Sequence, residues 1–430
     1  MTVQSTTESV DASRADDQEV LDVLLDTLAY AREREYTGWD YGDGMSSRIR
    51  RVLPFENRWI NLAFQETAKR TPINLRPLLL VEQRRNYKGA ALFAMTNLNV
   101  HELLDDSRPL DDSRPLNDSR RLNDSHHRDP SADYAAEARS LVEWLIEERC
   151  RGYSGFCGGH RHEIQHLRTK GVPNDPDVVS TAYAVQALLA ASRFEERRGN
   201  NEAAERYAEI ARTAADFVVE ELNYRELDGG AMIDYHLNHP DDVYTLNAGA
   251  LGARLFVDLY DQFGDERLLE RAERILDYLV STQTEAGGWY YREPPSTSHL
   301  SMDNHHNGFI VEAFLRYREV VGDGRYDATI RDAHEFYRHT LFEPDGAPNF
   351  DESSAYPRDV HAAAQGILVF TYAEEPTFAR RILEWTFENL YDGEGRFYFR
   401  KHRFYTKRVV LMRWCQAWMT YAASEYLTTT

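Results

Sequence analysis

Lysine is scarce in this chain of 430 residues. The 50 basic residues include only five lysines, which are Lys69, Lys88, Lys170, Lys401 and Lys407. Asp and Glu number 71, so the formal net charge is −21. That sign disfavours general binding to nucleic acid or to an anionic membrane, and any basic surface must be local. An acidic, lysine-poor composition is typical of proteins that work in concentrated salt, which screens repulsion between like charges. We therefore expect a halophilic source.

Cysteine and long apolar runs are also rare. Three cysteines in so long a chain cannot form a disulfide framework, which favours a reducing compartment. The first twenty residues lack the basic and apolar regions of a signal peptide, and no run of about 18 apolar residues occurs. We expect a soluble cytoplasmic protein, which could still work at the inner face of the membrane.

Two segments carry little apolar surface. Residues 104–127 form four tandem hexapeptides with one Leu in each, and residues 1–15 are mostly polar. Such segments cannot bury enough surface to offset the entropy that they lose on ordering. We expect a disordered N-terminus over 1–15 and a disordered insertion over 104–127, within a single domain of residues 16–430.

The rest of the chain repeats as pairs of helices. In each pair, a segment that is apolar on nearly all sides precedes one that has a single apolar stripe, which is typical of an inner and an outer helix. The pairs are 86–99 with 132–149, 177–192 with 204–222, 244–260 with 266–283, 305–320 with 326–340, and 359–373 with 376–390. The spacing is that of a helical-hairpin repeat.

Two further helices lack a neighbour in sequence. Residues 16–34 form an amphipathic helix, and residues 410–427 have the composition of an inner one. They complete a sixth hairpin only if the chain closes into a ring. The sequence therefore predicts an all-α fold, an (α/α)6 toroid, with residues 36–85 as an Arg-rich connection over it.

The loops that lead into the inner helices would share one mouth, and unusual residues gather there. Aromatic rings can stack on sugar faces, while polar and basic groups can hold hydroxyls or an anion. The candidate substrate-binding residues are Trp289, Tyr291, Arg292, His306, Arg358, Tyr398, Arg400, Lys407, Arg413 and Trp414. From Arg396 to Arg413 there are seven basic and no acidic residues, which suggests a uronate or phosphate ligand. Pairing of these groups with acidic loops across the ring is the alternative.

The candidate catalytic residues lie at the starts of inner helices. They are Asp177, Asp303, Asp359, His305 and His361. Two carboxylates in different environments can act as acid and base on a glycosidic bond, and His can transfer protons near neutral pH. Asp also caps helices, so each of these carboxylates could equally serve the fold alone.

Two motifs suggest other chemistry. The sequence from His162 to His166 reads H-E-x-x-H, which binds zinc when it is helical. Closely flanking glycines argue against a helix there, so we predict no metal and no cofactor, although a metal on His160, His162 and His166 stays open. A single Q-x-x-x-G-G-W from Gln283 to Trp289 is similar to a terpene cyclase motif, but no D-x-D-D acid motif accompanies it.

Several segments resemble a known family. INLRPLL (73–79), VVSTAYAVQALL, MDNHHNGFIVEAF, YPRDVHAAAQGI and MRWCQAWMTYA are similar to six-hairpin glycosidase-like proteins encoded beside glycosyltransferases in surface-polysaccharide clusters. The chain most resembles the glycoside-hydrolase-like component of the haloarchaeal pathway that N-glycosylates the S-layer glycoprotein. The wider superfamily includes unsaturated glucuronyl hydrolases, whose catalytic Asp at the mouth implies a similar position for Asp177, Asp303 and Asp359.

The resulting hypothesis is a glycoside-hydrolase-like enzyme that processes a uronate-containing, lipid-linked glycan during assembly of a cell-surface glycoprotein. Its expected partners are that acidic glycan and the glycosyltransferases of the same pathway. A uronate C5-epimerase or lyase is the alternative, with His305 or His361 as base, Tyr291 as acid and Arg413 as the cation on the carboxylate. A non-catalytic scaffold that presents glycan to a glycosyltransferase is the other.

Overall fold

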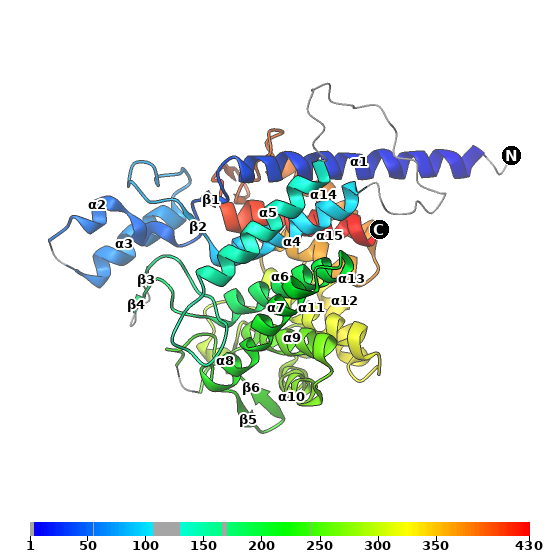
Figure 1. Ribbon diagram of the computed structural model, residues 1–430. Helices are drawn as coiled ribbons and strands as arrows, with labels where there is room; N and C mark the ends of the chain where they lie inside the picture. Colours follow the sequence, from blue (N-terminus) through cyan, green and yellow to red (C-terminus); the bar gives the residue numbers. More distant parts are fainter. Residues whose placement is uncertain (1–3, 55, 106–129, 166–169, 241) are drawn as a thin grey trace.

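The computed structural model describes residues 4–54, 56–105, 130–165, 170–240 and 242–430 (Figure 1). Six inner helices form a ring, and the last of them begins with a π-helical turn over Met412–Ala417. They are α4 (Tyr87–Leu104), α6 (Val178–Arg197), α9 (Leu246–Phe263), α11 (Asn304–Val321), α13 (Val360–Tyr372) and α15 (Trp418–Thr429). The outer helices are α1 (Gln4–Arg32), α5 (Pro130–Glu147), α7 (Asn201–Arg212) with α8 (Ala214–Glu220), α10 (Glu266–Thr282), α12 (Asp327–Thr340) and α14 (Pro376–Leu390).

The ring closes between the two ends of the chain. Each inner helix packs on the next from α4 to α15, and α15 packs on both α4 and α1 (Figure 1). The predicted (α/α)6 toroid is therefore confirmed, as is the pairing of the N-terminal with the C-terminal helix. Helix α1 begins at Gln4, so residues 4–15, which the sequence analysis leaves out of the domain, continue the helix. No Gly or Pro occurs in that stretch to stop it.

The inner helices approach one another closely because small residues lie between them. A Cβ on Gly308 of α11 would stand 2.3 Å from Cγ of Gln365 on α13. Buried polar groups also join these helices: Glu312 of α11 pairs with Arg254 of α9 and accepts a hydrogen bond from Gln365. The ring is therefore held by packing and by a buried polar network.

The connection between α1 and α4 forms a lobe beside the ring. It contains α2 (Arg48–Arg51), α3 (Arg58–Arg70) and a 3-10 turn over Asp43–Ser46, and it is framed by β1 (Thr37–Gly38) and β2 (Arg84–Arg85). The buried Arg76 holds it together, because its guanidinium donates to Asp43 Oδ1 at 2.8 Å, to the Ala68 carbonyl and to the Asp40 carbonyl. The lobe protrudes to the left in Figure 1.

Short antiparallel pairs of strands lie in the segments between the helices. They pair β3 (Ile164–Gln165) with β4 (Lys170–Gly171), β5 (Arg225–Leu227) with β6 (Gly230–Met232), β7 (Tyr244–Thr245) with β8 (Arg292–Glu293), and β10 (Arg400–Lys401) with both β9 (Arg358–Asp359) and β11 (Thr406–Lys407).

The insertion predicted over 104–127 lies outside the described residues from 106 onward. No helix of the described residues combines the length and the apolar character that a bilayer span requires.

Candidate functional site

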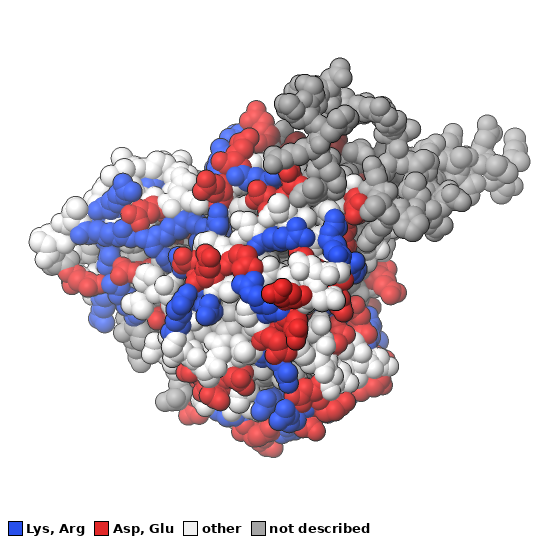
Figure 2. Space-filling model, viewed as in Figure 1, with Lys and Arg blue, Asp and Glu red and all other residues white. Residues whose placement is uncertain are grey.

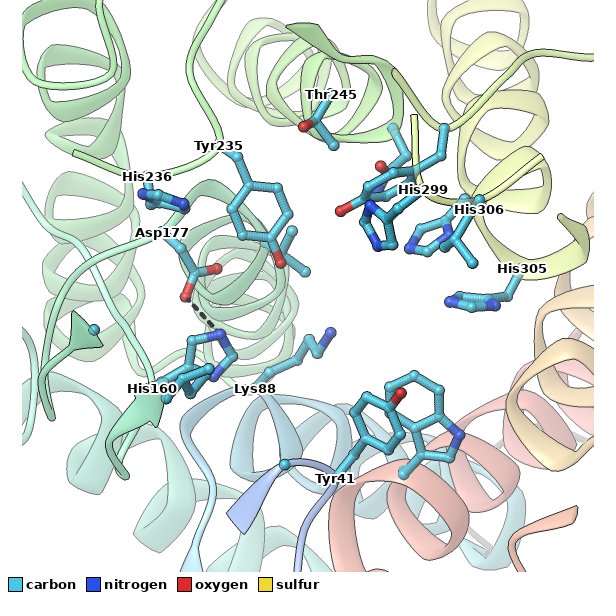
Figure 3. A pocket seen from close by; sticks show the side chains of 18 of the residues that line it. Tyr41, Lys88, His160, Asp177, Tyr235, His236, Thr245, His299, His305 and His306 are labelled. Carbon is cyan, nitrogen blue, oxygen red and sulfur yellow. Dashed lines mark ion pairs between the residues drawn. The ribbon is translucent and has the colours of Figure 1, made fainter. Parts of the chain in front are cut away.

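The mouth of the ring contains a cavity of about 490 Å³, a size common among small-molecule sites (Figure 3). The loops before α6, α9 and α11, the starts of α4, α11 and α13, and the lobe all contribute to its wall. His160 and His162 line it, as do ten of the fifteen candidate catalytic and substrate-binding residues: Asp177, Tyr291, Arg292, Asp303, His305, His306, His361, Arg400, Arg413 and Trp414.

Trp289 does not lie on the cavity wall. Its indole is buried, stacks on Phe314 at 6.0 Å between ring centroids, and donates from Nε1 to the Leu279 carbonyl at 2.7 Å. The ring therefore packs in the core, which corrects its placement as a stacking surface for sugar.

Asp359 lies just behind the wall rather than on it. Its carboxylate caps α13 through the His361 amide, pairs with Arg400 and accepts the Trp414 indole N–H at 2.8 Å. The side chain is buried. Asp359 therefore positions two cavity-lining residues and does not face the cavity itself.

Partners elsewhere in the fold neutralise much of the basic window from Arg396 to Arg413. Arg396 pairs with Asp392, and Arg413 makes a two-pronged ion pair with the buried Asp40. Lys407 donates to the Lys69 carbonyl and does not line the cavity.

Two other candidates also lie away from the cavity wall. A guanidinium nitrogen of Arg358 lies 3.9 Å from a carboxylate oxygen of Glu343, and the side chain of Tyr398 is half-buried against the core. Within the window, the pairing alternative holds for three of the seven basic residues, Arg396, Arg400 and Arg413.

On one wall of the cavity, Asp303 orients two imidazoles. It caps α11, and its carboxylate lies 2.8 Å from Nδ1 of His306 and 3.3 Å from Nδ1 of His305. His361 stacks on His305 at 4.7 Å, and neither of its ring nitrogens has a hydrogen-bond partner. Burial lowers the pKa of His305 and of His361 well below the usual value, so both are neutral bases near neutral pH.

A second carboxylate–imidazole pair lies on the opposite wall. Asp177 caps α6 through the Ser180 amide, and its Oδ2 lies 3.7 Å from Nε2 of His160 (Figure 3). Burial lowers the pKa of His160 and of the neighbouring His236, and it raises the pKa of Tyr235 well above 10. This wall therefore offers neutral imidazoles and a phenol that keeps its proton.

Lys88 lies between the two walls (Figure 3). Its side chain is only 9% exposed, and burial, with the nearby charge of Arg413, lowers its pKa to about 7. Its charge in turn lowers the pKa of His160 on one wall and of His305 on the other. Asp177 acts on Lys88 through space and not by a hydrogen bond. Lys88 is thus a buried ammonium available to an anion.

Lys88 was not among the residues singled out from the sequence, although the scarcity of lysine carried the signal. Three of the five lysines, Lys69, Lys88 and Lys170, line this one cavity. Arg292, Arg400 and Arg413 line it as well, beside the acidic Asp175, Asp177 and Asp303, but Lys170, Arg400 and Arg413 already pair with carboxylates outside the lining. Lys69, Lys88 and Arg292 are therefore the cations left to face an acidic ligand.

The wall around Asp303 could also hold a metal ion. Ligand atoms of Asp303, His305 and His306 all lie within 4.8 Å of one another. Across the cavity, Ile164 and Gln165 of the H-E-x-x-H motif form the strand β3 instead of a helix, so the helical zinc site is not formed there; His166 lies outside the described residues.

No family model and no curated protein matches this sequence. Solved structures match in shape at low identity. A family 76 glycoside hydrolase (mannosidase) from Bacteroides thetaiotaomicron gives a TM-score of 0.57 at 9% identity, over 96% of this chain and 98% of that one. Cellobiose 2-epimerase from Bacillus thermoamylovorans gives 0.56 at 14%, over 80% and 87%. A polysaccharide lyase gives 0.53 at 9%, over 96% of both. This chain shares their fold. The same fold thus occurs in a mannosidase, a sugar epimerase and a polysaccharide lyase, so the fold alone assigns no reaction.

Proposed function

We propose that this protein moves a proton on and off a carbon of an acidic sugar, as a uronate epimerase does. The observation that carries the proposal is the pair of opposed carboxylate–imidazole groups, Asp177 with His160 and Asp303 with His306. Inversion at a carbon requires removal of a proton from one face and delivery of a proton to the other. Groups on opposite walls of one cavity suit that requirement.

The chemistry can be written with the residues of this chain. An imidazole that carries no proton on its acceptor nitrogen takes the proton from the carbon beside the uronate carboxylate, and the electron pair spreads into that carboxylate. Lys88 offsets the growing charge there. The opposite face then receives a proton from the phenol of Tyr235, which keeps its proton, or from an imidazole of the other wall that took up a proton before the sugar bound. Each Asp stabilises the imidazolium that forms beside it.

An elimination would begin with the same proton removal. If the substituent on the neighbouring carbon then leaves with the electrons of its own bond, the pair left by the proton forms a double bond. The product is an unsaturated uronate, and the enzyme is a lyase. Hydrolysis has less support here, because it calls for two carboxyl groups on the scissile bond, whereas Asp359 lies behind the wall and Asp177 and Asp303 cap helices.

Exchange of the sugar proton with solvent tests the reaction. We expect uronate disaccharides incubated with the enzyme in heavy water to gain deuterium beside the carboxylate, as followed by NMR. His306→Gln and His160→Gln should each abolish exchange from only one of the two epimers. The control is His339→Gln, on the outer helix α12. Tight binding without any exchange would instead favour the glycan-presenting scaffold, and release of sugar without exchange would favour a hydrolase.

The biological setting is a separate part of the proposal. The sequence resemblance favours a lipid-linked uronate glycan that is modified during N-glycosylation of an S-layer glycoprotein, alongside glycosyltransferases. NMR spectroscopy of the glycan from a deletion strain should reveal a uronate of altered configuration, or mass spectrometry should reveal a truncated chain. An unchanged glycan would contradict this setting but not the chemistry.

A further inference from the structure

The lobe helix α3 buries polar residues and exposes a tryptophan. The residues that it buries are Asn61, Gln65 and Ala68, at the spacing of one helical face. Asn61 and Gln65 hydrogen-bond to Gln165 of the mouth. Trp59, by contrast, is 60% exposed. A helix normally buries its large apolar side chains, so the exposed indole lacks the partner that its composition calls for.

The segments beside α3 extend this exposed apolar surface. Among the residues that the structure describes, eleven large hydrophobic side chains are exposed, and six of them lie between residues 49 and 80. We refer to these six as the lobe surface: Ile49, Val52, Trp59, Ile73, Leu78 and Leu80. Val52 is 80% and Leu78 72% exposed. Single exposed hydrophobics are ordinary, but such a concentration in one small lobe marks an interaction site.

The charge of the lobe is opposite to that of the whole chain. From β1 to β2, residues 37–85 contain nine basic and five acidic residues, against a net charge of −21 overall. Some of these cations are paired, since Arg48 and Arg51 contact Glu82 and the buried Arg76 pairs with Asp43, but an excess of positive charge remains. The lobe in Figure 2 carries a blue band of basic side chains beside a white tip.

We propose that the lobe surface docks on an anionic lipid bilayer. Trp59, Val52 and Leu78 would enter the headgroup region, where tryptophan and aliphatic side chains partition well, while the neighbouring arginines contact lipid phosphates. A second copy of this chain fits less well, because a symmetric contact would bring the same arginines face to face. The apolar side chains carry the binding in concentrated salt, where electrostatic attraction is screened.

Docking would place the mouth beside the membrane. The inner edge of α3 contributes Gln65 and Lys69 to the cavity wall, while its outer face carries Trp59. A sugar carried on a membrane lipid would then reach the cavity without leaving the bilayer surface. The docking itself depends on the lobe alone and not on which reaction the cavity performs.

Vesicle binding by the full-length protein tests the proposal. We expect co-sedimentation with phosphatidylglycerol vesicles and weaker binding to phosphatidylcholine vesicles. Trp59 is the only strongly exposed residue among the seven tryptophans, so binding should shift its fluorescence to the blue and shield it from acrylamide. Trp59→Phe should remove that spectral change while most of the binding remains.

Paired variants define the surface. Val52→Glu with Leu78→Glu should weaken partition at least about tenfold, since burying each apolar side chain contributes more than the free energy of a tenfold change. Val280→Glu replaces an exposed valine on the outer helix α10 and is the control. Three results would each overturn the proposal. One is that neither kind of vesicle binds the protein, and another is that the control loses as much binding as the double variant. The third is a dimer or protein complex that forms without lipid and that Val52→Glu with Leu78→Glu disrupts.

Discussion

Replacing Lys88 by methionine should stabilise the protein and abolish its activity. The pKa of Lys88 is about 7 in the fold against 10.5 for a free lysine, and each pKa unit corresponds to 1.36 kcal/mol. The folded protein therefore loses up to about 5 kcal/mol by keeping this ammonium in the cavity. Methionine has a similar length and no charge, so Lys88→Met should recover most of that free energy of unfolding.

The gain should depend on pH in a defined direction. Below pH 7 Lys88 is charged in both the folded and the unfolded state, so the full cost of burial is present. Between pH 7 and about 10.5 the folded state gives up the proton first, the unfolded state binds more protons, and the stability of the wild type rises with pH. Lys88→Met should thus stabilise most near pH 6 and least near pH 10.

Denaturant unfolding at several pH values, at constant salt, measures this difference. Lys401→Met is the control, because Lys401 bonds to Asn389 and does not line the cavity. A stabilisation below about 1 kcal/mol at pH 6, or one equal at both pH values, would refute the reasoning. An acidic sugar that binds beside Lys88 should raise its pKa, so calorimetry at pH 8 in two buffers should detect proton uptake on binding.

Two further changes separate the roles of buried carboxylates. Asp303→Asn should keep the cap on α11 but lose the charge that orients His305 and His306. Turnover should therefore fall about 10²- to 10⁴-fold in a kinetic assay, while the melting temperature changes little. Unchanged turnover would remove Asp303 from the site. Glu312→Gln should leave the buried guanidinium of Arg254 with Asp258, 3.6 Å away, as its remaining counter-charge, and should lower the free energy of unfolding by about 1 to 3 kcal/mol in urea titrations. A loss under about 1 kcal/mol would mean that water reaches the pair.

The ring could be predicted because the sequence separates its two kinds of helix. Inner helices are apolar on all sides and outer helices on one, so the closure between α1 and α15 follows from counting them. The mouth followed from the same geometry, since every inner helix starts there. These features depend on local composition, which a single sequence displays directly.

The errors concern contacts between distant parts of the chain. Arg413 looked available for an anion because no acidic residue lies near it in sequence, yet Asp40, its partner, is 373 residues away. Trp289 follows two glycines, a pattern that suits a core ring as well as a sugar platform. Asp359 was expected in the site, but its carboxylate lies behind the cavity wall and caps α13. The exposure of Trp59 on α3 was missed as well, because periodicity identifies a stripe but not the side that faces the ring.

Closure of the ring also constrains how the protein is made on the ribosome. Helix α4 needs both α6 and α15 beside it, and α15 begins only at Trp418. During synthesis, the apolar side of α4 that α15 covers therefore stays exposed until α15 has emerged. Arg413 likewise reaches Asp40 only late in synthesis. Nascent chains should consequently remain vulnerable to aggregation until α15 is made, and a chain truncated before α15 should expose this seam to chaperones and proteases.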